Sequence, residues 1–425
     1  MGDVAQLAEP LIRRLLRGEP PVAIEFWDGS SLGPQASPTR ITVRSPLAFR
    51  RLLWSPSELA LARAYVAGEI DIDGDVYEAL GVRDVEASRR EDLEMKLGPG
   101  GRLQLLRLAR SLGILGPPPV PPREEARLRG RRHSKRRDAA AISHHYDLSN
   151  RFYRWVLGAT MTYSCAYFAT PETSLDDAQR AKHDLICRKL GLERGDRLLD
   201  VGCGWGGMVM HAAGNYGVRA VGITVSRPQA DLAAKRVADA GLADLVEIRL
   251  QDYRDVDDGP FDAISSIGMF EHVGLAQLKR YFVVLFGLLR DEGRLLNHAI
   301  SKLSGRARFA KDSFIARYVF PDGELHEVGS VVTAMQEQGF EVRDVESLRE
   351  HYARTLRSWV ANLEGHWNEA VEEVGSARAR IWRLYMAGSA LNFTAGGINV
   401  HQVLGVKSGN GGGSGMPPTR AQMLP

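Results

Sequence analysis

Three glycines, Gly202, Gly204 and Gly206, could let the backbone approach a bound ligand, because a Cβ at these positions would obstruct it. They follow a short apolar stretch, 197–201, and precede a helical pattern over 208–213, so the order is strand, glycine turn and helix. The carboxylate of Asp200, at the end of the strand, could anchor the loop. We interpret this segment as a cofactor loop, although GxGxG alone is a weak signal.

The residues after the loop distinguish two kinds of cofactor. A pyrophosphate site favours GxGxxG and an acidic residue about 20 positions further on for the ribose hydroxyls. Here the next strand ends near Thr224 and Ser226, which weakens the dinucleotide interpretation. A later strand, 245–250, leads to Asp252 and Tyr253, which could hydrogen-bond to an adenine and stack on it. A turn cap is the structural alternative for Asp252.

Strands and helices alternate around these residues. Strands are expected at 197–201, 219–225, 245–250, 261–266 and 294–300, with a helix at 227–240. This order predicts an α/β fold with a mostly parallel, doubly wound sheet of the methyltransferase kind. Its ligand should lie at the carboxyl ends of the strands.

The chain of 425 residues is long enough for two domains. A helix over 4–16 that starts or kinks at Pro10, strands at 23–27 and 40–43, and a helix over 57–67 predict a small α+β domain before residue 116. The Pro-rich stretch 117–122 is interpreted as a linker.

A basic run follows the linker. Its eight basic residues are Arg123, Arg127, Arg129, Arg131, Arg132, Lys135, Arg136 and Arg137. The run suits either a solvated tether or docking on anionic phospholipid headgroups; nucleic-acid binding is less favoured because no aromatic residues interleave with the charges.

Composition excludes several classes of protein. A formal net charge of +3 does not favour a protein that wraps nucleic acid. Three cysteines without a CxxC give neither a disulfide framework nor a zinc site, which fits a reducing cytoplasm. No apolar stretch approaches the roughly 20 residues of a spanning helix. If a membrane matters, we therefore expect the protein to visit it from the aqueous side, at the inner face of the cell membrane.

Five motifs together resemble the cyclopropane-fatty-acyl-phospholipid synthase family, which includes mycolic acid cyclopropane synthases and actinobacterial 10-methylene fatty acid methyltransferases. The motifs are His145-Tyr146-Asp147-Leu148-Ser149-Asn150, Met161-Thr162-Tyr163-Ser164-Cys165-Ala166-Tyr167-Phe168, Leu199-Asp200-Val201-Gly202-Cys203-Gly204-Trp205-Gly206, Gly268-Met269-Phe270-Glu271-His272-Val273-Gly274 and Tyr318-Val319-Phe320-Pro321-Asp322-Gly323. The stretch 62–74 also resembles the small lipid-facing domain of the full-length enzymes.

The resemblance implies a domain plan and an architecture. Residues 1–115 would form the lipid-facing α+β domain, 116–140 the linker, 141–407 the catalytic domain and 408–425 a disordered tail. The catalytic domain would be a Rossmann-like class I S-adenosylmethionine (SAM)-dependent methyltransferase domain with a helical cap over the acyl chain. An apolar stripe at Tyr352, Leu356, Trp359, Leu363 and Trp367 suits such a cap, or simple core.

The resemblance also implies the site residues. The SAM contacts would be Tyr163, Ser164, Gly202, Gly204, Thr224, Gln229, Asp252 and Tyr253. A bicarbonate ion would be bound by Cys165, Glu271, His298, Tyr318 and the backbone of Ile300, and the first four of these would be the catalytic residues. Of the neighbours Glu271 and His272 we favour Glu271 for chemistry. Asn297, in Asn297-His298-Ala299-Ile300, stands where many synthases have leucine, and Ala299 where they have threonine.

The residue types suit this chemistry independently. Methylation of a cis alkene develops positive charge on the acyl chain, and a nearby anion in a dry site stabilises it. A small base held by the four side chains could then take the proton that must leave. The expected substrate is an unsaturated acyl chain of a membrane phospholipid.

Alternatives remain for the product and for the activity. The expected product is a cyclopropane; the rival is a methylene branch, for which a reductase would be a partner. A nucleic-acid methyltransferase lacks support, since neither an Asn-Pro-Pro-Tyr nor a Pro-Cys motif is present, and a non-catalytic lipid-binding protein would be expected to lose the loop glycines or Glu271. The sequence leaves open whether the chain forms a homodimer.

Overall fold

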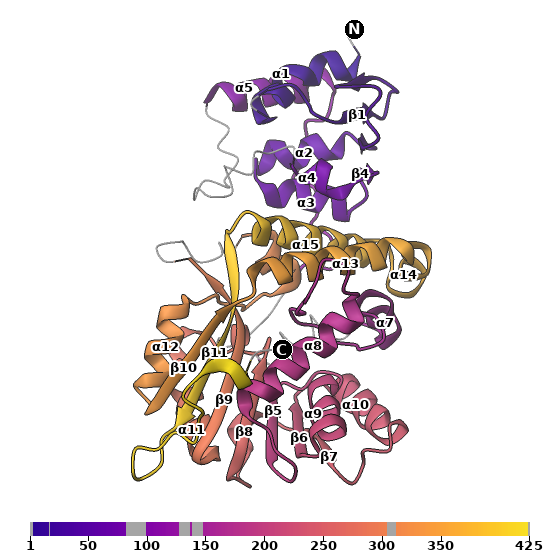
Figure 1. Cartoon of the computed structure of the whole chain (residues 1–425). Coiled ribbons are helices and arrows are strands. Elements are labelled where there is room, and N and C mark those ends of the chain that lie inside the picture. The colour runs from indigo at the N-terminus through magenta and orange to yellow at the C-terminus, as the bar shows by residue number, and fades with distance from the viewer. Residues whose placement is uncertain are drawn as a thin grey trace. The chain divides into compact units, whose positions relative to one another are not determined.

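The computed structural model describes residues 3–16, 18–81, 99–126, 137, 148–303 and 312–423. The chain divides into two compact units (Figure 1). The smaller unit comprises Met1–Arg127, Phe309–Val319 and His366–Ala395, and the larger unit comprises Leu128–Arg308, Phe320–Gly365 and Gly396–Pro425. This division differs from the predicted domain plan, because two later segments join the N-terminal residues.

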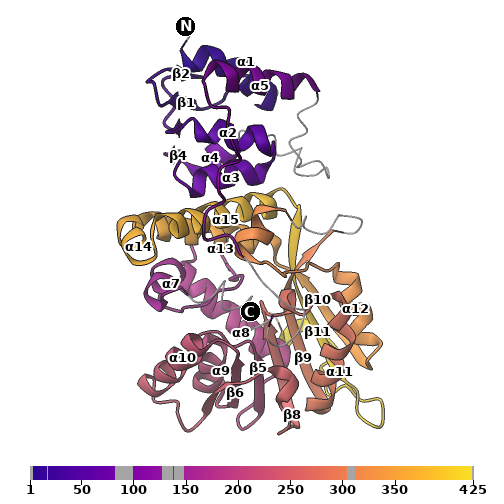
Figure 2. The same cartoon turned by 180° about the vertical axis from the view of Figure 1, so that it is seen from behind.

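The smaller unit contains a four-stranded sheet in the order β2-β1-β3-β4. Its strands are β1 (Ala23–Phe26), β2 (Ser31–Leu32), β3 (Arg40–Val43) and β4 (Ile70–Asp73). Its N-terminal helices are α1 (Val4–Leu16), α2 (Leu47–Trp54), α3 (Glu58–Val66), α4 (Val76–Gly81) and α5 (Pro99–Ser111). The predicted strands at 23–27 and 40–43 and the helix at 57–67 are present, whereas β2 and β4 were not predicted. Helix α1 runs through Pro10 and contacts α5, beside which it lies in both views (Figure 2).

Two helices from late in the chain, α14 (Trp367–Val374) and α15 (Ser376–Thr394), complete the smaller unit. Two arginines of α15 bind the N-terminal part. Arg380 pairs with Asp71 at 2.9 Å, and Arg383 donates to the carbonyl of Ile72 at 3.0 Å. These contacts join residues about 310 positions apart, so local patterns could not predict them.

The larger unit is built on a seven-stranded sheet in the order β10-β11-β9-β8-β5-β6-β7. The strands are β5 (Arg197–Val201), β6 (Arg219–Thr224), β7 (Val246–Leu250), β8 (Phe261–Ile267), β9 (Leu289–Lys302), β10 (Phe340–Ser347) and β11 (Ile398–Lys407). Pairing is parallel from β9 to β7, while β11 is antiparallel to both β9 and β10. The five predicted strands are all present, and the sheet is mostly parallel as expected.

Helices cover both faces of this sheet because its central strands are apolar on both sides. Leu199 packs in one core with α11 (Leu278–Leu288) and α12 (Val328–Gln336). The adjacent Leu198 packs in a second core with α8 (Leu175–Leu190), α9 (Gly207–Tyr216) and α10 (Arg227–Asp239). Figures 1 and 2 show these two helical layers on opposite sides of the sheet. The arrangement is the doubly wound fold predicted above.

Helices α7 (Asn150–Leu157) and α13 (Arg349–Gly365) contact each other in the larger unit. The predicted apolar stripe lies on α13 as far as Leu363, and Trp359 is fully buried. Trp367 differs from the prediction: α13 ends at Gly365, so this side chain starts α14 in the smaller unit.

The structure bears on three further predictions, which concern the basic run, the C-terminal tail and membrane-spanning helices. Most of the basic run, 127–136, lies outside the described residues, as does 145–147 of the first motif. The expected disordered tail has contacts as far as residue 423: Arg420 pairs with Asp344 at 2.8 Å, and Met423 is buried. Among the described residues, no helix is both long enough and apolar enough to span a membrane.

Candidate active site

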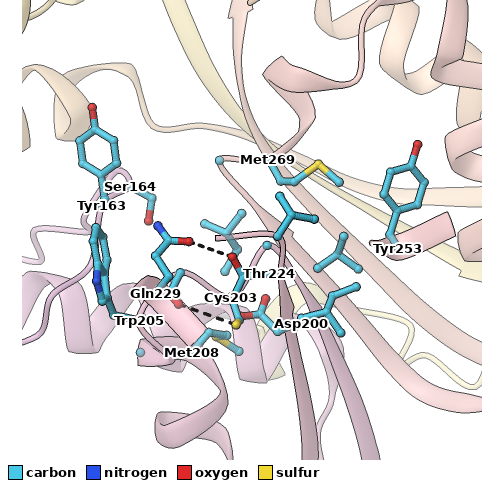
Figure 3. Close-up of a pocket in the computed structure, with 18 of the residues that line it drawn as sticks. Tyr163, Ser164, Asp200, Cys203, Trp205, Met208, Thr224, Gln229, Tyr253 and Met269 are labelled. Atoms are coloured by element: carbon cyan, nitrogen blue, oxygen red, sulfur yellow. Dashed lines mark hydrogen bonds between the residues drawn. The ribbon is translucent and has the colours of Figure 1, made fainter. Parts of the chain in front are cut away.

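One pocket of the larger unit lies where β5, β6 and β7 end, the edge at which such sheets bind ligands. Its lining includes all eight residues expected to contact SAM: Tyr163, Ser164, Gly202, Gly204, Thr224, Gln229, Asp252 and Tyr253. Figure 3 shows Tyr163 and Ser164 on one side and Tyr253 on the opposite side. The glycine loop and the end of β6 therefore lie between two walls that can hold the two ends of an elongated ligand.

The glycine loop has the backbone geometry that its composition predicts. Gly202, Gly204 and Gly206 all have positive φ, at 82°, 55° and 82°. A Cβ on Gly204 would meet no atom within 4 Å, whereas one on Gly202 would lie 3.0 Å from Met269. Since Gly204 lines the pocket, the open space beside it is space for the ligand.

At the end of β6, where a dinucleotide site would have an acidic residue for the ribose, this chain has the hydroxyl of Thr224 and the amide of Gln229. Thr224 donates its hydroxyl to Oε1 of Gln229 at 2.9 Å, which the dashed line in Figure 3 marks. Ser226 caps α10 by accepting the backbone N–H of Gln229. This cap fixes the start of α10 and directs the Gln229 amide into the pocket, so the pair can hydrogen-bond to ribose hydroxyls without a carboxylate.

Asp252 acts as a cap, which was the structural alternative to its role as an adenine contact. It caps the short helix η2 (Tyr253–Asp255) by accepting the backbone N–H of Arg254 at 2.9 Å. It also receives two hydrogen bonds from the Arg254 guanidinium, at 2.8 and 2.6 Å. The Arg254 charge therefore lies against the Asp252 carboxylate. Tyr253 packs edge-on against Tyr281, with ring centroids 5.2 Å apart.

Two residues of α8 that the sequence analysis missed position the opposite wall. Gln179 donates to the backbone carbonyls of Thr162 and Ser164, at 3.3 and 2.9 Å. Lys182 donates from Nζ to the Ser164 hydroxyl at 3.0 Å and lines the pocket. Both side chains are completely buried. Their spacing of three positions on the inner face of one helix was the only sign in the sequence that could have singled them out.

A buried carboxylate, Asp200, interacts electrostatically with this lysine. Asp200 accepts the Ser265 hydroxyl at 2.6 Å. Burial raises the pKa of Asp200 to about 6, although the Ser265 hydrogen bond and the Lys182 charge lower it. Burial lowers the pKa of Lys182 to about 7, and the carboxylate opposes this shift.

The histidine expected to act in catalysis is held by a glutamine on the neighbouring strand. His298 on β9 pairs in register with Gln402 on β11, and the Gln402 amide donates to Nδ1 of His298 at 3.2 Å. An amide nitrogen can only donate, so the imidazole proton is placed on Nε2. This Nε2 is buried and has no hydrogen-bond partner among the described residues. Burial lowers the pKa of His298 well below its ordinary value, so the ring is neutral.

Glu271 lies on the short helix η3 (Phe270–His272), and its carboxyl contacts β9 at Ile300, two residues after His298. Its Oε1 accepts the backbone N–H of Ile300 at 2.7 Å, whereas its Oε2 is buried without a partner in the described part of the chain. Burial raises the pKa of Glu271 to about 7. The adjacent Met269 and His272 line the pocket, and burial lowers the pKa of His272 to about 4. Neither Glu271 nor His298 lines the pocket itself, but each neighbours residues that do: His272 follows Glu271, and the Gly268 N–H donates to the His298 carbonyl at 2.9 Å.

Cys165 and Tyr318 are placed differently. Cys165 is fully buried, its thiol donates to the carbonyl of Ala166 at 3.3 Å, and burial raises its pKa, so it is a neutral donor. Tyr318, on η5 (Ile315–Val319), belongs to the smaller unit. There its hydroxyl donates to Glu125 at 3.3 Å, and Glu125 also binds Arg63.

These contacts fit a small oxyanion in part. The Nε2–H of His298 is a donor with no partner in the described residues, and the Glu271 carboxyl could donate when protonated. The backbone N–H of Ile300, however, is already bound by Glu271. Bicarbonate is therefore compatible with Glu271 and His298, while Ile300 would be available only if the carboxyl releases it.

The seven-stranded, mostly parallel sheet and the positive-φ glycine loop after β5 are features of the class I SAM-dependent methyltransferase fold. Comparisons with known proteins agree. Residues 133–403 match the mycolic acid cyclopropane synthetase family, and residues 12–83 match a domain of unknown function.

Individual relatives cover different shares of the chain. A probable fatty acid methyltransferase of Mycobacterium tuberculosis is 46% identical over 411 residues, 94% of each chain. The cyclopropane-fatty-acyl-phospholipid synthase of Escherichia coli K12 is 38% identical over 279 residues, 65% of this chain and 71% of that protein. The crystal structure of a mycolic acid cyclopropane synthase complexed with SAH and CTAB has a TM-score of 0.60 and 36% identity, covering 63% of this chain and 97% of that one.

The chain belongs to the mycolic acid cyclopropane synthetase family. It is a SAM-dependent fatty acid methyltransferase of that family. The predicted family and fold class are thereby confirmed.

Proposed function

We propose that the protein transfers the one-carbon unit of SAM to the cis double bond of an unsaturated acyl chain in a membrane phospholipid, forming a cyclopropane. One observation carries this proposal. The buried Glu271 and His298 each keep one atom without a hydrogen-bond partner among the described residues, and their immediate neighbours His272 and Gly268 line the cofactor pocket. Polar groups are rarely buried in this way unless a ligand or a reaction uses them.

The reaction needs a methyl donor and a proton acceptor. The alkene's π electrons form a bond to the methyl carbon, the carbon–sulfur bond breaks, and its electrons stay on sulfur. One alkene carbon is then methylated and its neighbour is positively charged. Loss of a proton from the new methyl group supplies the electron pair that closes the ring. Burial keeps water from capturing the cation.

The chain's own residues position this proton transfer. Gln402 sets the His298 proton on Nε2, and Ile300 orients the Glu271 carboxyl. Glu271, with a pKa near neutrality, can hold or release a proton at working pH. Bicarbonate, held by Glu271 and His298 with the Cys165 thiol as a further expected ligand, would supply the small base.

A methylene branch is the second candidate. If a hydride first moves between the two former alkene carbons, the cation lies on the methylated carbon. Loss of a proton from the new methyl group then leaves a methylene (=CH₂) branch on the chain. The specific support is the 46% identical relative, whose name is a fatty acid methyltransferase rather than a cyclopropane synthase. A reductase would then act on the product.

Support for a membrane substrate comes from α5 in the smaller unit. Leu103 and Leu106 are exposed at 47% and 49%, and Arg102, Arg107 and Arg110 are exposed around them. Apolar side chains ringed by arginines suit the surface of an anionic membrane. We therefore propose that the protein binds the membrane peripherally, from the cytoplasm.

We also propose that α13 forms part of the cap over the acyl chain. The ring centroid of its buried Trp359 lies 5.2 Å from that of the pocket residue Tyr163.

The test is incubation of the purified protein with vesicles of mono-unsaturated phosphatidylglycerol and SAM labelled in the methyl group, followed by lipid extraction. We expect label in the extracted phospholipid, and none when the acyl chains are saturated. Label on protein, on nucleic acid or on saturated lipid instead would contradict the proposed substrate.

A further inference from the structure

The cofactor pocket contains one cation that the chemistry above does not use. Four basic residues line it: Lys182, His183, Arg254 and His272. Burial keeps both histidines neutral by lowering their pKa, and Arg254 is bound by both oxygens of Asp252. Lys182, by contrast with Arg254, has no carboxylate at ion-pair distance within the described part of the chain, although it is completely buried.

Among the described residues Lys182 has one hydrogen-bond acceptor, the Ser164 hydroxyl at 3.0 Å. An ammonium group can only donate, so the Ser164 oxygen accepts and its own hydrogen is free to point elsewhere. Gln179 holds the Ser164 carbonyl at the same time, which leaves the hydroxyl as the group that faces the ligand. The result is a fixed O–H donor backed by a buried positive charge.

The position of this donor selects one end of the cofactor. Ser164 and Tyr253 lie on opposite sides of the pocket (Figure 3). If the adenine lies against Tyr253, the methionyl end lies at Ser164, and that end is a zwitterion of one ammonium and one carboxylate. Asp200 and Lys182 both line the pocket and interact electrostatically, so the lining offers one acidic and one basic group to this zwitterion.

We infer that Lys182 recognises the methionyl carboxylate of the methyl donor, holding Ser164 as a hydrogen-bond donor to it and supplying the opposing charge. This rests on the assignment of the pocket to SAM and deepens it by naming the group that binds the carboxylate. Burial also makes an isolated ammonium unfavourable, as the lowered pKa of Lys182 reflects. A bound carboxylate would relieve that penalty.

The test compares two ligands that differ only in this carboxylate, SAM and decarboxylated SAM, by isothermal titration calorimetry on the full chain. We expect Lys182→Met to weaken SAM binding by about 10-fold or more, the range of a charge-assisted hydrogen bond. Binding of decarboxylated SAM should be unchanged or tighter, because its remaining charges are positive. Ser164→Ala should show the same selectivity to a smaller degree and serves if Lys182→Met does not fold.

Gln179→Met is the matched control. It removes hydrogen bonds from the same helix to the same loop but carries no charge, so it should weaken both ligands by similar factors. The inference is overturned if Lys182→Met and Ser164→Ala weaken the binding of SAM and decarboxylated SAM equally, or weaken neither. The lysine would then only stabilise the fold or the charge of Asp200. Failure of the wild-type protein to bind SAM at all would instead refute the proposed function.

Discussion

Replacing Glu271 by Gln should stabilise the protein at alkaline pH although it removes a catalytic group. Glu271 is buried, and its pKa is raised from an ordinary value of 4.5 to about 7. A raised carboxyl pKa means that the folded protein binds the proton more tightly than the unfolded chain does. Folding therefore carries no penalty from this group below pH 4.5, and the penalty grows as the pH rises towards 7 and then stays constant.

The magnitude follows from the size of the shift. At about 1.4 kcal/mol for each pH unit between the two pKa values, the full penalty is about 3 kcal/mol at pH 8 and under about 1 kcal/mol at pH 5. Gln keeps the acceptor for the Ile300 N–H and has no charge to bury. The stability gained by Glu271→Gln should thus be larger at pH 8 than at pH 5 by about 2 to 3 kcal/mol. Effects of the substitution that do not depend on pH cancel in this comparison.

The assay is urea unfolding followed by circular dichroism at both pH values, with the two units resolved where their transitions separate. Glu337→Gln, at an exposed position that follows α12, is the control and should show no such difference. An equal stability change at pH 5 and pH 8 for Glu271→Gln would refute the argument that this carboxyl pays a desolvation penalty.

Three further outcomes follow from the site and from α5. Gly204→Ala should reduce SAM affinity by at least about 10-fold and cost about 1 to 2 kcal/mol in stability, because φ is 55° there and the new Cβ enters the ligand space; wild-type affinity by calorimetry would remove the loop from the site. His298→Ala and Gln402→Leu should lose most turnover while binding SAM almost normally, and wild-type turnover should fall in degassed buffer and recover with added bicarbonate; activity that ignores bicarbonate would exclude the ion. Leu103→Asp with Leu106→Asp should weaken sedimentation with anionic vesicles, and wild-type binding should fall with salt; equal binding to neutral and anionic vesicles at every salt concentration would leave α5 without a membrane role.

The cofactor site was predictable because its signals are local. The loop at Gly202 to Gly206 joins a strand to a helix within a few residues, Thr224 ends β6, and Asp252 follows β7 by two residues. Parallel strands end at one edge of a sheet, so residues that follow them meet there whatever the length of the connections. For this reason Gly202, Gly204, Asp252 and Tyr253 could be proposed as cofactor contacts from local patterns. The family resemblance supplied the other four, Tyr163, Ser164, Thr224 and Gln229, and all eight line one pocket.

The remaining features depend on contacts that periodicity does not carry. Lys182 and Gln179 lie on a helix whose apolar pattern indicates core, and only the packing of α8 against the 162–164 segment reveals their role. Gln402 acts through register with His298, 104 positions away. The place of α15 in the smaller unit rests on Arg380 and Arg383, whose partners lie about 310 residues earlier. Such pairings could be predicted only from a three-dimensional structure.

The product tests the central claim most directly, because ring and branch share the same mass gain of one CH₂. The protein should be incubated with mono-unsaturated phospholipid vesicles and SAM carrying a ¹³C methyl group, and the extracted lipid examined by proton and carbon NMR. The proposed reaction predicts the labelled carbon as a cyclopropane CH₂ with strongly shielded protons. A labelled olefinic CH₂ that a separate reductase converts to a methyl branch would contradict the cyclopropane product, and absence of label from the acyl chain would contradict the proposed function as a whole.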